Sequence, residues 1–204
     1  AISAHFDTLL GITEDELRST FSQQIAEMAE EYDVTKEEIL IKLKRQFDGY
    51  HFSRRMRGVY NPFSILRAFK EMLIDDYWFQ TGSPSYLVRL LAHSDENINE
   101  LVGKYYPTKD FDDYKATIER PLPMIYQSGY LTIKGWSRNT NSYLLDFPND
   151  EVRWGFISLL AADYLKPKVS PDSWVLQVIE ALGKGECEKL HQLMVSFFAS
   201  IPYS

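Results

Sequence analysis

The turn Gly82-Ser83-Pro84 is the best candidate in the sequence for a place where residue types and spacing could serve chemistry. Ser83 is a typical N-cap residue, and Pro84 fits the first position of a helix because its missing N–H would have no partner there. The sequence therefore predicts a helix that begins at this turn. The first N–H groups of a helix are free and carry a partial positive charge, so an anion or the polar edge of a ring could bind there.

Three arginines, Arg54, Arg55 and Arg57, form a second candidate site. They lie between two short runs of strand-like composition, residues 50–52 and 58–60, which predict a hairpin with the arginines at its tip. Guanidinium groups bind phosphate oxygens in pairs, so this tip could contact phosphate or nucleic acid. A solvated loop tip is the alternative interpretation, because charged side chains are common on exposed loops.

No other group of residues in the sequence has the spacing of a known site. The four histidines never stand three or four residues apart, which excludes a histidine pair on one helix face, and Cys187 is the single cysteine. The sequence contains neither a G-x-S-x-G motif for a nucleophilic serine nor a G-x-x-x-x-G-K-[ST] phosphate loop. We therefore predict no catalytic residue and no metal ligand in this chain.

Helices are the main elements that the sequence predicts around these candidates. Capping boxes open helices over residues 13–31 and 35–47, because each box precedes an apolar run with helical period. Asn61-Pro62 opens a third helix with the same N-cap and proline arrangement as Ser83-Pro84. Residues 95–117 show no clear period, and we expect a polar helix or loop over the first part of that segment.

The C-terminal part of the sequence alternates helix and hairpin. A short helix is predicted near residues 121–128, a β-hairpin over 130–147 and an amphipathic helix from Pro148 to Tyr164. This order is the outline of a winged-helix module. Two further helices follow, one beginning at Ser170-Pro171 and the last over residues 186–198.

The predicted fold is mainly α with small β-hairpins, a helical lid-like bundle followed by a winged-helix-like module. We divide it into a helical region over 1–118, the winged-helix-like module over 119–166 and C-terminal helices over 167–204. The 204 residues are 45% hydrophobic, which is enough for a packed core.

The net charge and the length of the apolar runs limit the classes of partner that this chain could bind. The formal net charge of -7 argues against strong nonspecific binding to nucleic acid or anionic membranes, which needs an excess of cations. No apolar run reaches the length of about 18 residues that a membrane helix needs. With its single cysteine, the sequence therefore predicts a soluble protein of the reducing cytoplasm.

Five segments in the same order resemble the C-terminal half of a bacterial family of predicted AAA-like ATPases. That family is similar to archaeal-type and STAND-class ATPases and often carries a PD-(D/E)XK nuclease-like domain further downstream. The segments are DGYHFS, VYNPFSILRAF, YWFQTGSPSYLVRLL, IYQSGYLTIKG and YLLDFPNDEVRWGF. The resemblance extends from about Leu10 to Tyr164.

The resemblance implies that this chain is part of a longer protein. The activity that it implies, ATP hydrolysis, belongs to that longer protein. It implies ATP and Mg2+ as ligands, but the phosphate loop and the paired carboxylates that bind them are missing here. This chain would be the lid and winged-helix arm, with an ATPase core on its N-terminal side and the nuclease-like domain on its C-terminal side as partners. In related STAND-class proteins the proline of a G-x-P turn packs on the adenine, and Gly82-Ser83-Pro84 matches that turn. The resemblance gives the segments around Tyr50 and Asn61 roles in packing and capping.

Two other classes of function stay open. A winged-helix module could bind DNA, although the helix expected to read the bases has no basic residue beyond Arg120. The chain could also be a structural or dimerising helical domain without a ligand.

Overall fold

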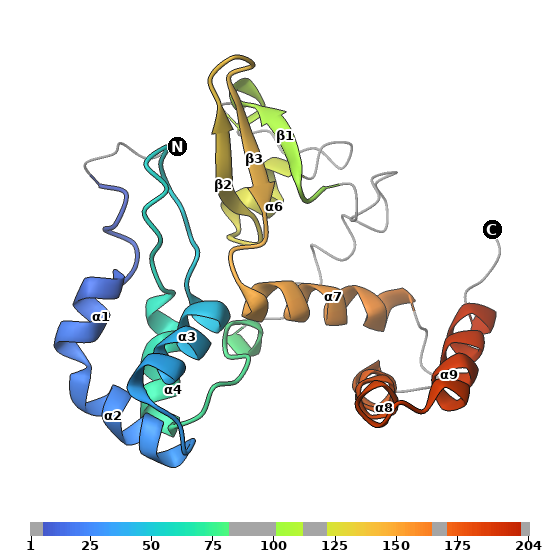
Figure 1. The fold of residues 1–204 in the computed structure, drawn as a ribbon. Helices are drawn as coiled ribbons and strands as arrows, with labels where there is room; N and C mark the ends of the chain where they lie inside the picture. Colours follow the sequence, from blue (N-terminus) through green and yellow to red (C-terminus); the bar gives the residue numbers. More distant parts are fainter. Residues whose placement is uncertain (1–5, 82–100, 112–121, 165–170, 201–204) are drawn as a thin grey trace. The chain divides into compact units, whose positions relative to one another are not determined.

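A computed structural model of the protein describes residues 6–81, 101–111, 122–164 and 171–200. The chain separates into two compact units, Ala1–Trp154 and Gly155–Ser204. The described residues are mainly helical and include a small three-stranded antiparallel sheet, in agreement with the coarse fold class that the sequence predicts (Figure 1).

Four helices pack around the main core of the first unit. They are α1 (Glu14–Thr20), α2 (Ser22–Glu31), α3 (Lys36–Phe47) and α4 (Pro62–Glu71). Leu17, Met28, Leu43 and Ile65 from these helices are buried completely in one cluster. Burial of one apolar face of each helix is what stabilises elements of only two to three turns.

The N-caps predicted at Thr13, Thr35 and Asn61 are confirmed. The Thr13 and Thr35 side chains each accept the N–H of the glutamate three residues later, and that glutamate binds the N–H of the threonine in return. Asn61 caps α4, whose first residue is Pro62. The helix predicted over 13–31 is wrong in one respect, because it breaks at Phe21, whose ring stacks on Phe69. The apolar period continues across this break and so does not reveal it.

The hairpin that carries the three arginines is also present, in a short form. Tyr50 pairs with Val59 in an antiparallel bridge, and Tyr60 pairs with Ile12 in a second bridge. The tip turns at Met56, which has a φ of 55°.

The sheet consists of β1 (Lys104–Pro107), β2 (Thr132–Ser137) and β3 (Ser142–Asp146) in the order β1-β3-β2. Strands β2 and β3 form the predicted hairpin. The expectation of a polar helix or loop is wrong for residues 104–107, which form β1 and pair with β3. This strand lies at the edge of the sheet with mostly exposed side chains, so it carries no alternating apolar pattern that could predict it.

Three short helices precede the hairpin of β2 and β3 in the sequence. Helix η1 (Trp78–Thr81) comes before β1, and η3 (Thr108–Phe111) and α6 (Leu122–Gln127) come between β1 and β2. The longer helix α7 (Asp150–Tyr164) follows β3. The predicted helices near 121–128 and after Pro148 are confirmed. The helix start predicted at Ser83-Pro84 lies outside the described residues.

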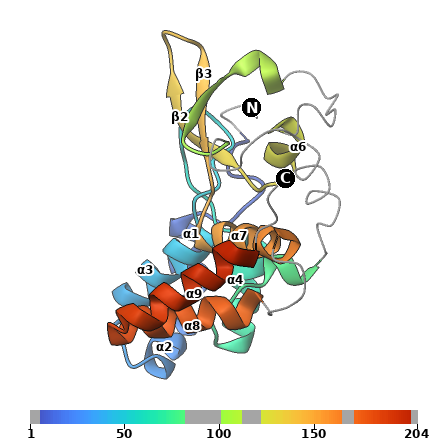
Figure 2. The same cartoon turned by 90° about the vertical axis from the view of Figure 1, so that its right-hand side faces the viewer.

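The second unit contains a pair of helices, α8 (Pro171–Lys184) and α9 (Cys187–Ser200), as the sequence predicts. They lie side by side (Figure 2), and the Trp174 ring stacks on the Phe197 ring with 4.7 Å between centroids. Gly185 makes the turn between them with a φ of 68°. Across the parts of the chain that the structure describes, no helix is long and apolar enough to cross a membrane.

Candidate functional site

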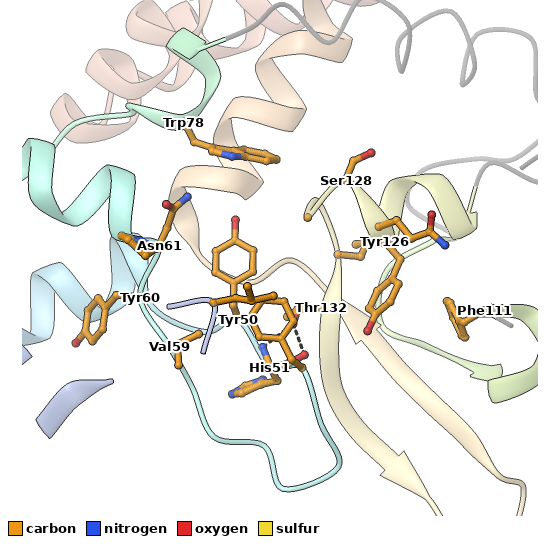
Figure 3. Close-up of a pocket in the computed structure, with 16 residues that line it drawn as sticks. Tyr50, His51, Val59, Tyr60, Asn61, Trp78, Phe111, Tyr126, Ser128 and Thr132 are labelled. Carbon is orange, nitrogen blue, oxygen red and sulfur yellow. Dashed lines mark hydrogen bonds between the residues drawn. The ribbon is translucent and has the colours of Figure 1, made fainter. Parts of the chain in front are cut away.

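A cavity of about 610 Å3 opens in the first unit. The arm of the first hairpin, the start of α4, η1, the end of α6 and the start of β2 all contribute to its wall (Figure 3). The lining residues are Leu10, Tyr50, His51, Phe52, Val59, Tyr60, Asn61, Pro62, Trp78, Phe111, Tyr126, Gln127, Ser128, Gly129, Leu131 and Thr132.

Aromatic rings face the cavity from several elements. Figure 3 shows Trp78 on one side, the Tyr50 ring pointing toward it, and Tyr126 and Phe111 further away on the side of α6 and η3. The Trp78 ring contacts the Tyr130 ring edge to face at 4.9 Å, and Tyr126 contacts Phe111 in the same way at 5.1 Å. These contacts fix the rings as walls of the cavity.

The described lining residues include no Asp, Glu, Lys or Arg. Among the described lining residues, only His51 ordinarily titrates near neutrality, and its burial, together with nearby Lys134, lowers its pKa. Burial also raises the pKa of Tyr126 to about 12 and raises that of Tyr50 further. The described part of the wall is therefore uncharged at pH 7.

Hydrogen bonds hold the hairpin arm against β2. The His51 N–H donates to Thr132 Oγ1 at 2.7 Å, and the Thr132 hydroxyl donates to the His51 carbonyl at 3.1 Å. His51 Nδ1 lies 2.8 Å from the Ile133 carbonyl, which can only accept, so Nδ1 carries the proton of the neutral ring. Lys134 Nζ donates to the Gly49 and Pro148 carbonyls at 3.0 and 2.7 Å, next to the same arm.

Glu151 fixes the Trp78 side of the cavity from behind. It lies in the first turn of α7 and is fully buried. Its Oε1 accepts the N–H groups of Tyr77 and Trp78 at 2.8 and 2.9 Å, and its Oε2 accepts the Ser64 hydroxyl at 2.9 Å. Burial raises the pKa of Glu151, and the three hydrogen bonds oppose that shift. One carboxylate thus connects α7, η1 and α4.

The structure places two of the three arginines in contacts within the protein. The Arg54 guanidinium lies 4.4 Å from the centroid of the Trp136 ring and donates to Tyr143 Oη at 3.3 Å. Arg57 forms an ion pair with buried Asp7, whose pKa is lowered chiefly by a hydrogen bond from Ser53. Arg55 is exposed. A phosphate or nucleic-acid contact at this tip stays a prediction.

The candidate turn Gly82-Ser83-Pro84 lies outside the described residues. In the sequence it directly follows η1, whose Trp78 lines the cavity. Within the ranges that the structure describes, no group of three or more His, Cys, Asp or Glu side chains could hold a metal ion.

Sequence reasoning did not identify the cavity or Glu151. A signal was present for the cavity, because all of its lining residues except Leu10 and Phe111 come from four of the five segments that carry the family resemblance. Tyr50 and Asn61 were assigned to packing and capping there. No comparable signal marked Glu151, since an acidic residue in the first turn of a helix is ordinarily explained by the helix dipole.

Comparison with known proteins gives one distant relative. The chain is 26% identical over 205 residues to "Uncharacterized protein in vnfD 5'region" from Azotobacter chroococcum mcd 1. The alignment covers 100% of this chain and 37% of the relative, so the chain spans little more than a third of that protein's length. No family model matches the chain, and no solved structure matches it.

Proposed function

We propose that the chain is the non-catalytic lid and winged-helix portion of an AAA-like ATPase and contributes to nucleotide sensing and interdomain coupling in a longer protein. In this proposal Gly82-Ser83-Pro84 contacts the nucleotide. ATP and Mg2+ bind to an ATPase core outside this chain. The winged-helix-like module consists of α6, β2, β3 and α7.

The observation that carries this proposal is the set of hydrogen bonds around Glu151. Its carboxylate joins the first turn of α7 to Tyr77 and Trp78, which stand shortly before Gly82 in the sequence. A displacement of the segment that leads into Gly82 would change these two hydrogen bonds and so act on α7 and on the hairpin before it. Such a contiguous set of contacts is a physical route for coupling.

The Azotobacter relative also supports the proposal. This chain aligns to 37% of its length, which leaves room in that protein for further domains. A lid and winged-helix arm needs such neighbours, because it has no phosphate loop of its own.

The test is nucleotide binding by the full-length protein. We expect Pro84→Ala to weaken ATP binding about tenfold, because the loss of an apolar ring surface against the base corresponds to one or two buried methylene groups. Titration calorimetry with a non-hydrolysable ATP analogue measures this.

Pro171→Ala is the matched control, because Pro171 follows a serine in the sequence as Pro84 does and is the first residue of α8. We expect this variant to bind ATP as the wild type does. Unchanged affinity in Pro84→Ala would contradict the assignment of the nucleotide contact.

A winged-helix DNA-binding module is the second candidate, and the exposed Arg55 at the hairpin tip favours it. Against it, Arg54 packs on Trp136, and the α6 sequence LPMIYQ has no basic residue for reading base edges. A salt-dependent shift of duplex DNA at micromolar protein would favour this function, and its absence at low salt would remove it.

A dimerising helical domain is the third candidate. Exposed apolar side chains on α8 and α9 favour it, namely Val175, Leu176, Ile179, Leu182, Val195 and Phe198. Size-exclusion chromatography with light scattering tests it, and a strict monomer would count against dimerisation.

A further inference from the structure

We propose that the cavity between Tyr50, Trp78 and Tyr126 binds an uncharged aromatic small molecule whose edge carries hydrogen-bonding groups. This inference does not rest on the proposed ATPase function, because it concerns described residues of this chain and requires neither phosphate nor Mg2+.

The walls of the cavity favour an aromatic ligand. The Trp78 ring is held by Phe79 and Tyr130 at centroid distances of 5.1 and 4.9 Å, and Phe111 supports Tyr126. Rings that are fixed in this way present flat, polarisable faces at a small cost in conformational entropy. A planar ring can stack on such a face or contact its edge, whereas a saturated ring cannot lie flat against it.

The absence of charge in the described wall selects against ionised ligands. A carboxylate or phosphate that entered the cavity would lose water and gain no opposite charge in exchange. Lys134 and Glu151 are charged groups close to the wall, and each already binds protein atoms. Lys134 donates to two carbonyls, and Glu151 accepts three hydrogen bonds.

Neutral polar groups supply the hydrogen bonds for the edge of the ligand. The Asn61 amide and the Tyr50 hydroxyl both lie on the Trp78 side of the cavity (Figure 3). The neutral His51 ring offers Nε2 as an acceptor, because Nδ1 is used by the Ile133 carbonyl. Gln127 and Ser128 are exposed at the rim and can donate or accept.

The size of the cavity favours a free small molecule over a single side chain of a partner protein. Its volume of about 610 Å3 falls in the range of roughly 300–1,000 Å3 that small-molecule sites occupy. One aromatic side chain would fill only part of it and would leave the remaining polar groups of the wall to water.

The test uses three probes that differ in one property each. Benzamide is uncharged and aromatic and has a polar edge, benzoate adds a negative charge, and cyclohexanecarboxamide removes the aromatic ring. Ligand-observed NMR with the whole chain measures their affinities. We expect benzamide to bind at least about tenfold more tightly than either of the other two.

Two variants connect this binding to the cavity. Trp78→Leu removes a wall, and Ser128→Trp places a large side chain at the exposed rim without a change in the core. We expect both to weaken benzamide binding at least about tenfold. Trp154→Leu, at an exposed position of α7 that does not line the cavity, is the matched control and should bind benzamide normally.

Three results would overturn the inference. Benzoate that binds as tightly as benzamide would contradict the selection against charge, and equal binding by cyclohexanecarboxamide would contradict the role of the rings. Normal benzamide binding in a folded Ser128→Trp variant would place the probe outside the cavity.

Discussion

Glu151 is a carboxylate that the protein buries completely and surrounds with hydrogen-bond donors. Backbone N–H groups of Tyr77 and Trp78 and the hydroxyl of Ser64 all point to it. The buried Tyr77 N–H and Ser64 hydroxyl would lose this acceptor if the carboxylate were removed, and an unsatisfied buried donor destabilises a protein more than a hydrogen bond stabilises it. The residue therefore matters for stability as well as for the proposed coupling.

We expect Glu151→Ala to lower the free energy of unfolding by about 2–3 kcal/mol, because several buried donors lose their acceptor. Urea denaturation followed by circular dichroism measures the change. Glu188→Ala is the control, because Glu188 occupies the same second position in α9 but is exposed. A Glu151 variant as stable as this control would show that water or another acceptor replaces the carboxylate.

Two glycines with positive φ provide a second prediction for single residues. Gly49 has a φ of +107°, and a Cβ atom there would lie 2.1 Å from the Pro148 carbonyl oxygen. Gly103 has a φ of +71° with nothing within 4 Å of such an atom. We expect Gly103→Ala to cost about 1 kcal/mol from backbone conformation alone, and Gly49→Ala to cost at least about 2 kcal/mol more because the backbone must also move.

Thermal unfolding of the two glycine variants tests this difference. Equal melting temperatures would mean that the contact between Gly49 and Pro148 is not as close as the structure has it. The comparison of these two variants also tests the position of one wall of the cavity, because Gly49 directly precedes the lining residues Tyr50 and His51.

The capping box formed by Thr35 and Glu38 determines where helix α3 begins. The Thr35 hydroxyl accepts the Glu38 N–H at 3.2 Å, and its loss leaves an N–H of the first turn without a side-chain partner. We expect Thr35→Ala to lower the free energy of unfolding by about 1 kcal/mol. Thr20→Ala, at the exposed end of α1, is the control, and an equal effect of both variants in urea denaturation would contradict the prediction.

The same box makes the stability of α3 depend on pH. The Thr35 N–H donates to the Glu38 carboxylate at 2.8 Å and lowers the pKa of Glu38 below its ordinary value of 4.5. A carboxylate with a lowered pKa in the folded state stabilises the fold above its unfolded pKa, and this contribution is lost as the pH falls through the folded pKa. The difference in melting temperature between wild type and Glu38→Gln should therefore be present at pH 7 and shrink on acidification.

At the scale of the whole molecule, the two units differ in how much apolar surface they bury. The α3 helix alone has Ile39, Leu40, Leu43 and Phe47 in the core. Among residues 173–198, whose side chains the structure describes, only Ala181 is buried. Helices with few buried contacts open locally at a lower cost than helices at the centre of a core.

Hydrogen exchange measured by mass spectrometry should reveal this difference. We expect amides of α9 to exchange at least about tenfold faster than those of α3, since exchange follows the cost of local opening. The α3 peptides serve as the internal reference within the same sample. Equal protection of α9 would show that a partner or another part of the chain covers its exposed apolar side chains.

Local features of this fold could be predicted from the sequence because each depends on a few neighbouring residues. The capping boxes of α1 and α3 need only a threonine and the glutamate three residues later, and Asn61 with Pro62 is enough to start α4. The hairpin of β2 and β3 was likewise visible from two apolar runs and the polar turn between them.

Features that depend on partners distant in the sequence could not be predicted in this way. Strand β1 forms because β3 offers it backbone groups, and Phe21 interrupts its helix where its ring meets Phe69. The cavity also depends on such partners, since its residues come from separate segments that share no spacing.

The sequence by itself thus determined where several of the described helices begin and the mainly helical composition with a small hairpin, and it predicted that five segments resemble an ATPase family. Only the tertiary structure decided that four of these segments line one uncharged cavity and that Glu151 holds Trp78 from behind. The physical reason is that caps and turns are satisfied by residues close in the chain, whereas burial of a carboxylate or the closing of a cavity requires groups that only folding brings together.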